Sequence, residues 1–299
     1  MTDPTGYVSF EDFIQSDLFT FHVGEEKRRF VVHSKVVADT SPVFDRLVHG
    51  GLKESQDRCA EIEDVDPETF IRFLEYAYRR DYTDPSSSQA PTTLSTASNG
   101  SNGFGAAEGS SWNSNSAPSD FGAMAYIPSA PFGSSTKKTK KLGKVSMSSR
   151  TAFNNRQYIQ PDQDASSLLR ARFEPRPNTS PSQDFAPIFL AHARLYTLAG
   201  MRMVHPLRDL ALHKLHKTLV SFELYPERLG DVAELARYAY ENGADRTEDG
   251  RIDALREMVV NYIACEMKVL GKHAEFRNLM DGGGEFAGDF WDIVSQELP

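Results

Sequence analysis

The chain has 299 residues, which at roughly 150 residues a domain predicts about two domains. Its hydrophobic share of 39% is low for a globular protein, so part of the chain is expected to stay unfolded. The net charge of −9 argues against direct binding to nucleic acid or anionic membranes. Two cysteines, Cys59 and Cys265, exclude a disulfide framework and a four-cysteine zinc site. With neither a signal peptide nor an apolar run of about 20 residues, the protein is expected to be cytoplasmic, nuclear or both.

The first 84 residues combine helical and strand patterns. A short helix carrying Phe10, Phe13 and Ile14 precedes two apolar stretches, 19–23 and 30–32, which predict a pair of strands joined by a polar turn. Further elements are then expected in chain order: a helix capped by Ser34, a helix opened by Ser41-Pro42 and broken at His49-Gly50-Gly51, a strand at 59–62, and a helix opened by Asp66-Pro67.

Residues 85–184 have a different composition, with 21 Ser, 9 Pro and 7 Gly and neither a helical nor an alternating apolar pattern. Such a segment buries too little apolar surface to offset its ordering entropy, so we expect a disordered insertion. Its 10 Lys and Arg exceed its 6 Asp and Glu, so it carries +4 and leaves −13 on the remainder.

Beyond residue 184 the pattern is helical throughout. Prolines at 187, 206 and 226 mark three helix starts, a fourth apolar run extends from Ile252 to Met267, and two short helices are expected around Phe276 and Phe290. The predicted class is therefore α+β, with a small sheet flanked by helices and an all-helical C-terminal region.

Several segments resemble the BTB/POZ domain in their order and spacing. They are Ser16-Asp17, Phe30 to His33, Ala38 to Phe44, Glu54-Ser55, Ile62 to Phe70, Tyr76 to Tyr78 and, after the insertion, Ala193 to Ala199 with Leu207. The resemblance implies a BTB/POZ domain formed by 1–84 and 185–220 around the insertion 85–184. The helices of 221–299 resemble the extension of filamentous-fungal BTB proteins.

The resemblance implies protein–protein interaction, commonly self-association and in many members docking to a cullin ubiquitin-ligase scaffold. Cullin-binding members carry an apolar residue, any residue and Glu after the third helix, and Leu52-Lys53-Glu54 occupies the matching place. Such a short pattern also arises by chance. The alternative is a non-ligase homodimeric scaffold or nuclear regulatory protein. No catalytic residues, cofactor or metal site are predicted.

Family dimers use the N-terminal helix, where Phe10, Phe13 and Ile14 either form a dimer face or pack on their own core. Many transcription-factor members also carry a basic residue directly after the histidine matching His33, paired with the aspartate matching Asp17. Ser34 stands there in this chain, and Lys35, one position on, is expected to face elsewhere. This departure weakens the case for a corepressor groove.

Three further features have competing interpretations. His213 and His216 lie one helical turn apart, and an exposed helix face is the preferred interpretation over a metal site. The two cysteines are expected to pack as small apolar groups. Five lysines cluster in the insertion and are either a nuclear-import signal or a solubilising charge run, with phosphorylation expected near Ser180-Pro181. These lysines are Lys137, Lys138, Lys140, Lys141 and Lys144.

Overall fold

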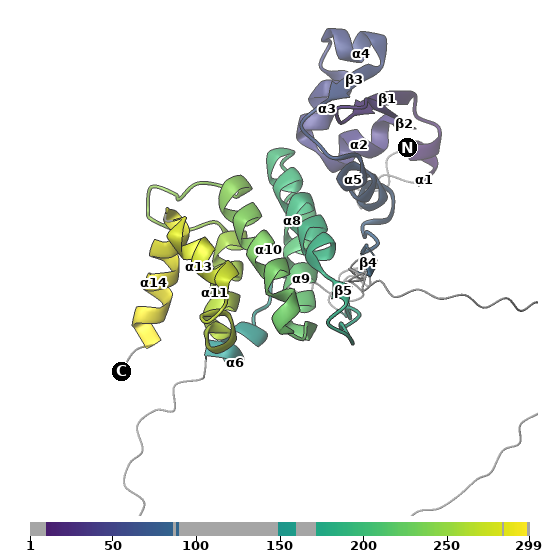
Figure 1. Ribbon diagram of the computed structural model, residues 1–299. Helices are drawn as coiled ribbons and strands as arrows, with labels where there is room; N and C mark the ends of the chain where they lie inside the picture. Colours follow the sequence, from purple (N-terminus) through teal and green to yellow (C-terminus); the bar gives the residue numbers. More distant parts are fainter. Residues whose placement is uncertain (1–9, 86–87, 90–148, 160–171, 283, 298–299) are drawn as a thin grey trace, which may run out of the picture. The chain divides into compact units, whose positions relative to one another are not determined.

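The structure of the protein is a computed structural model, and it describes residues 10–85, 88–89, 149–159, 172–282 and 284–297 (Figure 1). All of these residues belong to one unit, built from residues 1–91 together with 147–299.

A three-stranded sheet lies in the N-terminal part of this unit. Its strands are β1 (Leu18–Val23), β2 (Arg28–His33) and β3 (Cys59–Ile62), in the order β2-β1-β3. β1 is antiparallel to β2, with Phe21 opposite Phe30, and parallel to β3, with Phe21 opposite Ala60. Alternate side chains of β1, those of Phe19, Phe21 and Val23, are buried, as the period of a half-buried strand requires. The predicted strands are confirmed.

Short helices surround this sheet: α1 (Phe10–Ile14), α2 (Ser34–Thr40), α3 (Pro42–His49), α4 (Lys53–Asp57) and α5 (Pro67–Arg79). The predicted starts of α3 and α5 are confirmed, because Ser41 Oγ accepts from the Phe44 N–H at 3.2 Å and Asp66 Oδ2 from the Thr69 N–H at 3.0 Å. The predicted Ser34 cap is wrong. Ser34 is already the first residue of α2, and its N–H donates to the Asp17 carbonyl at 2.8 Å.

The C-terminal part is helical, as predicted. It comprises α8 (Ala186–Met201), α9 (His205–Ser221), the 3-10 turn η1 (Pro226–Arg228), α10 (Leu229–Asn242), α11 (Ala254–Cys265), α12 (Met267–Leu270), α13 (Ala274–Asp281) and α14 (Glu285–Glu297). In Figure 1, α8 runs beside α9 and α10, and it also contacts α5. A single apolar core extends from Phe19 in β1 to Phe290 in α14. None of the helices in the described part of the chain is long and apolar enough to cross a membrane.

The predicted insertion 85–184 is too wide, because both of its ends contribute to the folded unit. β4 (Ser88–Gln89) pairs with β5 (Gln183–Asp184) in an antiparallel ladder. The helix α6 (Ser149–Asn154) packs on α11 and buries Phe153, and Asn178 exchanges two 2.7 Å hydrogen bonds with the Glu223 backbone. Phe153 and the ion pairs of Arg150 with Glu266 and of Arg156 with Glu257 hold this segment, but such contacts leave no periodic apolar pattern in the sequence. The expected disorder of 90–148 and 160–171 lies outside the described residues.

Candidate protein-interaction site

An exposed turn follows α3 and carries the predicted partner-binding residues. Gly51, with φ of +76°, adopts a conformation that glycine favours, and the chain then enters α4 after Leu52. The Leu52 side chain is 62% exposed, and Glu54 is half-buried in the first turn of α4. The structure therefore brings the two residues together at the surface.

Leu52 lies at the edge of a hollow of about 440 Å³ that is lined by Leu47 of α3 and by Arg202. Arg202 comes from the turn after α8, where its guanidinium lies 5.6 Å from the centre of the Phe44 ring and 3.3 Å from Asp64 Oδ2. The Ser41 hydroxyl donates to the Arg202 carbonyl at 2.6 Å. Arg202 was missed by sequence reasoning, since no local pattern places it beside α3.

The three residues predicted for dimerisation divide between surface and core. Phe10 and Ile14, one turn apart on α1, are 66% and 50% exposed. Phe13 is buried and packs with Val36 of α2 and Ala77 of α5. Phe13 thus fixes α1 to its own domain, while the other two side chains remain available to a partner.

The ion pairs around Asp17 differ from those implied for transcription-factor members. Arg58 Nη2 lies 2.9 Å from Asp17 Oδ2, whereas Lys35 Nζ lies 3.6 Å from Asp12 Oδ2. Lys35 therefore faces α1 rather than Asp17, as the sequence predicts.

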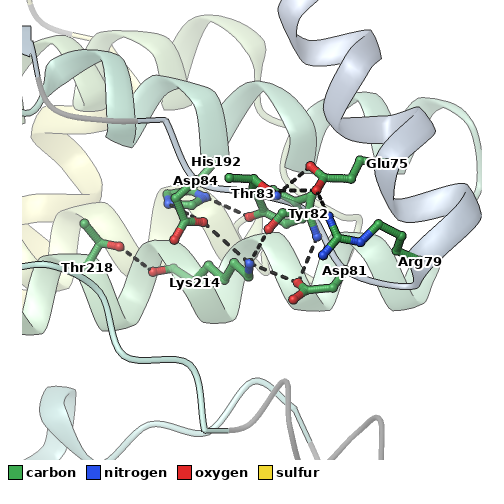
Figure 2. Close-up of polar contacts among 9 residues, drawn as sticks. All are labelled: Glu75, Arg79, Asp81, Tyr82, Thr83, Asp84, His192, Lys214 and Thr218. Atoms are coloured by element: carbon green, nitrogen blue, oxygen red, sulfur yellow. Dashed lines mark hydrogen bonds and ion pairs between the residues drawn. The ribbon is translucent and has the colours of Figure 1, made fainter.

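A buried polar cluster fixes the segment that follows α5 (Figure 2). At its centre is Lys214 of α9, whose side chain is 4% exposed. Lys214 Nζ donates to the Tyr82 carbonyl at 2.6 Å. It lies 3.0 Å from Asp81 Oδ1 and 3.5 Å from Asp84 Oδ1. It also lies 4.2 Å from the ring centre of Tyr82 and 4.8 Å from that of Phe173. Two carboxylates and two aromatic faces thus compensate the buried ammonium. We call Asp81, Tyr82, Asp84, His192 and Lys214 the Lys214 cluster.

Hydrogen bonds extend the Lys214 cluster to α8 and α5. The Tyr82 hydroxyl lies 2.7 Å from His192 Nδ1. Burial and the nearby Lys214 lower the pKa of His192 to about 3, while burial raises the pKa of Tyr82, so a neutral imidazole and a neutral phenol share this hydrogen bond. The Thr83 N–H and hydroxyl both donate to the Glu75 carboxylate at 2.7 Å. These contacts therefore hold residues 81–84, just before the insertion, against α5, α8 and α9.

The prediction that His213 and His216 lie on an exposed helix face is wrong. They are only 6% and 1% exposed. The ring of Phe153 in α6 packs against His216, with the ring centres 5.0 Å apart. The His216 Nε2 lies 2.8 Å from the Phe153 carbonyl, and burial lowers the pKa of His213 to about 4. Within the described ranges, no three or more His, Cys, Asp or Glu side chains are placed to hold a metal ion.

The remaining candidates are placed as follows. Cys59 and Cys265 are half-buried thiols, and Cys59 Sγ lies 3.5 Å from His22 Nδ1. Ser180 is half-buried at the start of a turn closed by a 3.2 Å hydrogen bond from the Gln183 N–H to its carbonyl. The lysine cluster at 137–144 lies outside the described residues.

Comparison with known proteins identifies the class of the N-terminal part. A family model described as the BTB/POZ domain matches residues 11–99, which include the three-stranded sheet and helices α2 to α5. A search of curated proteins gives no match for the chain. The protein contains a BTB/POZ domain, which is a protein–protein interaction module and not a catalytic domain. The fold class and the resemblance of the N-terminal part to this domain are thereby confirmed. The resemblance of 185–220 to later BTB helices and of 221–299 to the fungal extension stays a prediction.

Proposed function

We propose that the protein is a BTB adaptor that docks a cullin ubiquitin-ligase scaffold through Leu52 and Glu54. The observation that carries the proposal is the 62% exposure of Leu52 at the edge of a hollow. A large apolar side chain so exposed gains free energy when a partner covers it, and the neighbouring carboxylate gives that contact a polar rim. Self-association of the domain would make the adaptor bivalent.

Pull-down of purified cullin scaffold by the full-length protein tests the docking. We expect the double variant Leu52→Ala, Glu54→Lys to lose capture by at least tenfold. Asp57→Lys, a charge reversal at an exposed residue of the same helix, is the matched control and is expected to bind as the wild type does. Absence of wild-type binding, or equal binding by the double variant, would refute the adaptor mechanism.

The alternative function is a homodimeric scaffold or nuclear regulatory protein outside a ligase. It is supported by exposed apolar side chains on α1 and the sheet, namely Phe10, Ile14, Leu18 and Val31, which are 45% to 66% exposed. Light scattering of the full chain at tens of micromolar is expected to give the dimer mass. Phe10→Asp with Ile14→Asp is expected to give the monomer mass, and a monomeric wild type would contradict this function.

Nuclear localisation is proposed on the sequence of the lysine cluster alone. Replacing all five lysines with alanine is expected to abolish nuclear accumulation of a fluorescent fusion, because an import receptor recognises their charge. An unchanged nuclear signal would remove the proposal.

A further inference from the structure

One face of α8 is left open in the folded unit. Pro187, Leu190, Arg194, Thr197 and Met201 follow one another at intervals of three and four residues, so they share one face of the helix. All five are exposed or half-buried, and Met201 is 53% exposed. Most other α8 side chains are buried against α5, α9 and α10.

Two adjoining hollows lie over this open face. One of about 650 Å³ is lined by Pro187 and Leu190, and one of about 360 Å³ by Thr197 and Met201. Because Asp66, Thr69 and Arg194 line both, the two hollows form one groove. We call it the α8 groove. Its walls are the first turn of α5 and the outer side of α10.

The α8 groove is predominantly acidic. Its larger half is lined by six carboxylates and three arginines. Arg228 is engaged within the wall, 3.7 Å from Asp184 Oδ1 and 3.8 Å from Asp231 Oδ1. Glu227 and Glu234, by contrast, are exposed and have no salt bridge to any side chain in the described part of the chain. Arg72 and Arg194 also have no salt bridge to a described side chain, but the six carboxylates outnumber the three arginines, so the larger half carries an excess of negative charge beside the apolar side chains of Pro187 and Leu190.

We propose that the α8 groove binds a short lysine- or arginine-rich segment of a protein partner that also carries leucine-like side chains. The apolar side chains cover Leu190 and Met201, and the cations pair with Glu227 and Glu234. The 16 residues of α8 extend about 24 Å, which accommodates three to four turns of a bound helix or a shorter extended peptide. This site is separate from Leu52 and Glu54 and does not depend on cullin docking.

Fluorescence anisotropy of the full-length protein with labelled peptides tests the proposal. The probe is the 12-residue peptide LKKLLKKLLKKL, and the charge-reversed LEELLEELLEEL is its control. We expect saturable binding of the lysine peptide only, weakening at least fivefold when salt rises from 50 to 300 mM, because salt screens exposed charge pairs. Equal binding of both peptides, or no binding of the lysine peptide, would overturn the proposal.

Variants locate the binding on the molecule. Glu234 lies in the wall of the groove, and Glu234→Lys is expected to weaken the affinity for the lysine peptide about tenfold. Glu241 is exposed on the same helix but outside the groove, and Glu241→Lys is expected to change this affinity less than twofold. Arg194→Glu is expected to raise the affinity for the lysine peptide several-fold. The double variant Leu52→Ala, Glu54→Lys is expected to leave the affinity for the lysine peptide unchanged. Failure of the α8 groove proposal can therefore be distinguished from failure of cullin docking. Equal effects of Glu234→Lys and Glu241→Lys would refute the groove as the site.

Discussion

Ionisable side chains are buried in this protein where neighbouring groups compensate them. Lys214 is the clearest case, with two carboxylates and a carbonyl within 3.5 Å of its ammonium. Asp231 is less fully compensated. Its Oδ2 accepts from the Phe185 N–H at 2.9 Å just before α8, but Arg228 comes no closer than 3.8 Å. Burial consequently raises the pKa of Asp231 to about 6.

This raised pKa predicts that the titration of Asp231 makes the stability of the fold depend on pH. The folded state holds the proton more tightly than the unfolded chain, whose carboxyl has a pKa near 3.8. The stabilisation from protonation is therefore complete below about pH 3.8 and is lost as the pH rises through about 6. Asp231→Asn keeps the carbonyl acceptor and carries no charge. We expect the free energy of unfolding of the variant, relative to the wild type, to increase by roughly 1 to 3 kcal/mol as the pH rises from 4 to 7.

Urea unfolding at a series of pH values, followed by circular dichroism, measures this difference. Glu241→Gln removes a carboxylate from the exposed side of the same helix and is expected to leave the wild-type profile in place. A stability difference between Asp231→Asn and wild type that stays constant from pH 4 to pH 7 would contradict the assignment.

At the scale of secondary structure, one serine links two distant elements. Ser41 is fully buried, caps α3 by accepting from the Phe44 N–H, and donates its own proton to the Arg202 carbonyl after α8. The arginine positioned by this bond lines the hollow beside Leu52. The local helix signal and the tertiary contact therefore depend on the same hydroxyl.

Ser41→Ala is expected to lower the free energy of unfolding by about 1 to 2 kcal/mol, because it removes the cap and leaves the partly buried Arg202 carbonyl without its donor. Chemical denaturation measures the change. Ser295→Ala, on the exposed surface of α14, is the control and is expected to stay within about 0.5 kcal/mol of wild type. Equal stabilities of the two variants would show that Ser41 makes no such contribution.

On the scale of the whole molecule, the folded unit is assembled from two separated stretches of chain. The β4–β5 ladder pairs residues 88–89 with residues 183–184, and the Lys214 cluster connects Asp81 and Asp84 to α9. The apolar core is also shared, since Phe70 and Phe73 of α5 belong to the same cluster as Leu195 and Leu198 of α8. Covalent continuity through the insertion is therefore not what holds the two stretches together.

Cutting the insertion tests this conclusion. With a site-specific protease sequence placed after Gly105, we expect the two cleaved pieces to co-elute in gel filtration at micromolar concentration and to separate only in denaturant. Adding Lys214→Met is expected to lower the urea concentration at which they separate, because it leaves Asp81 and Asp84 without their buried cation. Pieces that separate in native buffer would contradict the shared core.

Local signals in the sequence determine much of this fold. Ser41-Pro42 and Asp66-Pro67 predict helix starts because capping and the fixed φ of proline act within one turn. Alternation in β1 predicts its buried face for the same reason, since the period of a strand is intrinsic to its backbone. The α4 helix was not predicted, because its five residues, KESQD, carry no apolar period.

Other properties are decided only by tertiary contacts. The spacing of His213 and His216 is the same whether the helix face is open or covered, and only the tertiary packing buries both, with Phe153 of α6 against His216. Arg202 lines the same hollow as Leu52, and Lys214 reaches Asp84, only through packing of segments that are far apart in the chain. The sequence by itself determined the class and the family resemblance, and it named Leu52 and Phe10 as candidates without deciding their exposure. Burial, partners and the α8 groove follow from the packed structure, because solvent exclusion depends on every element that surrounds a residue.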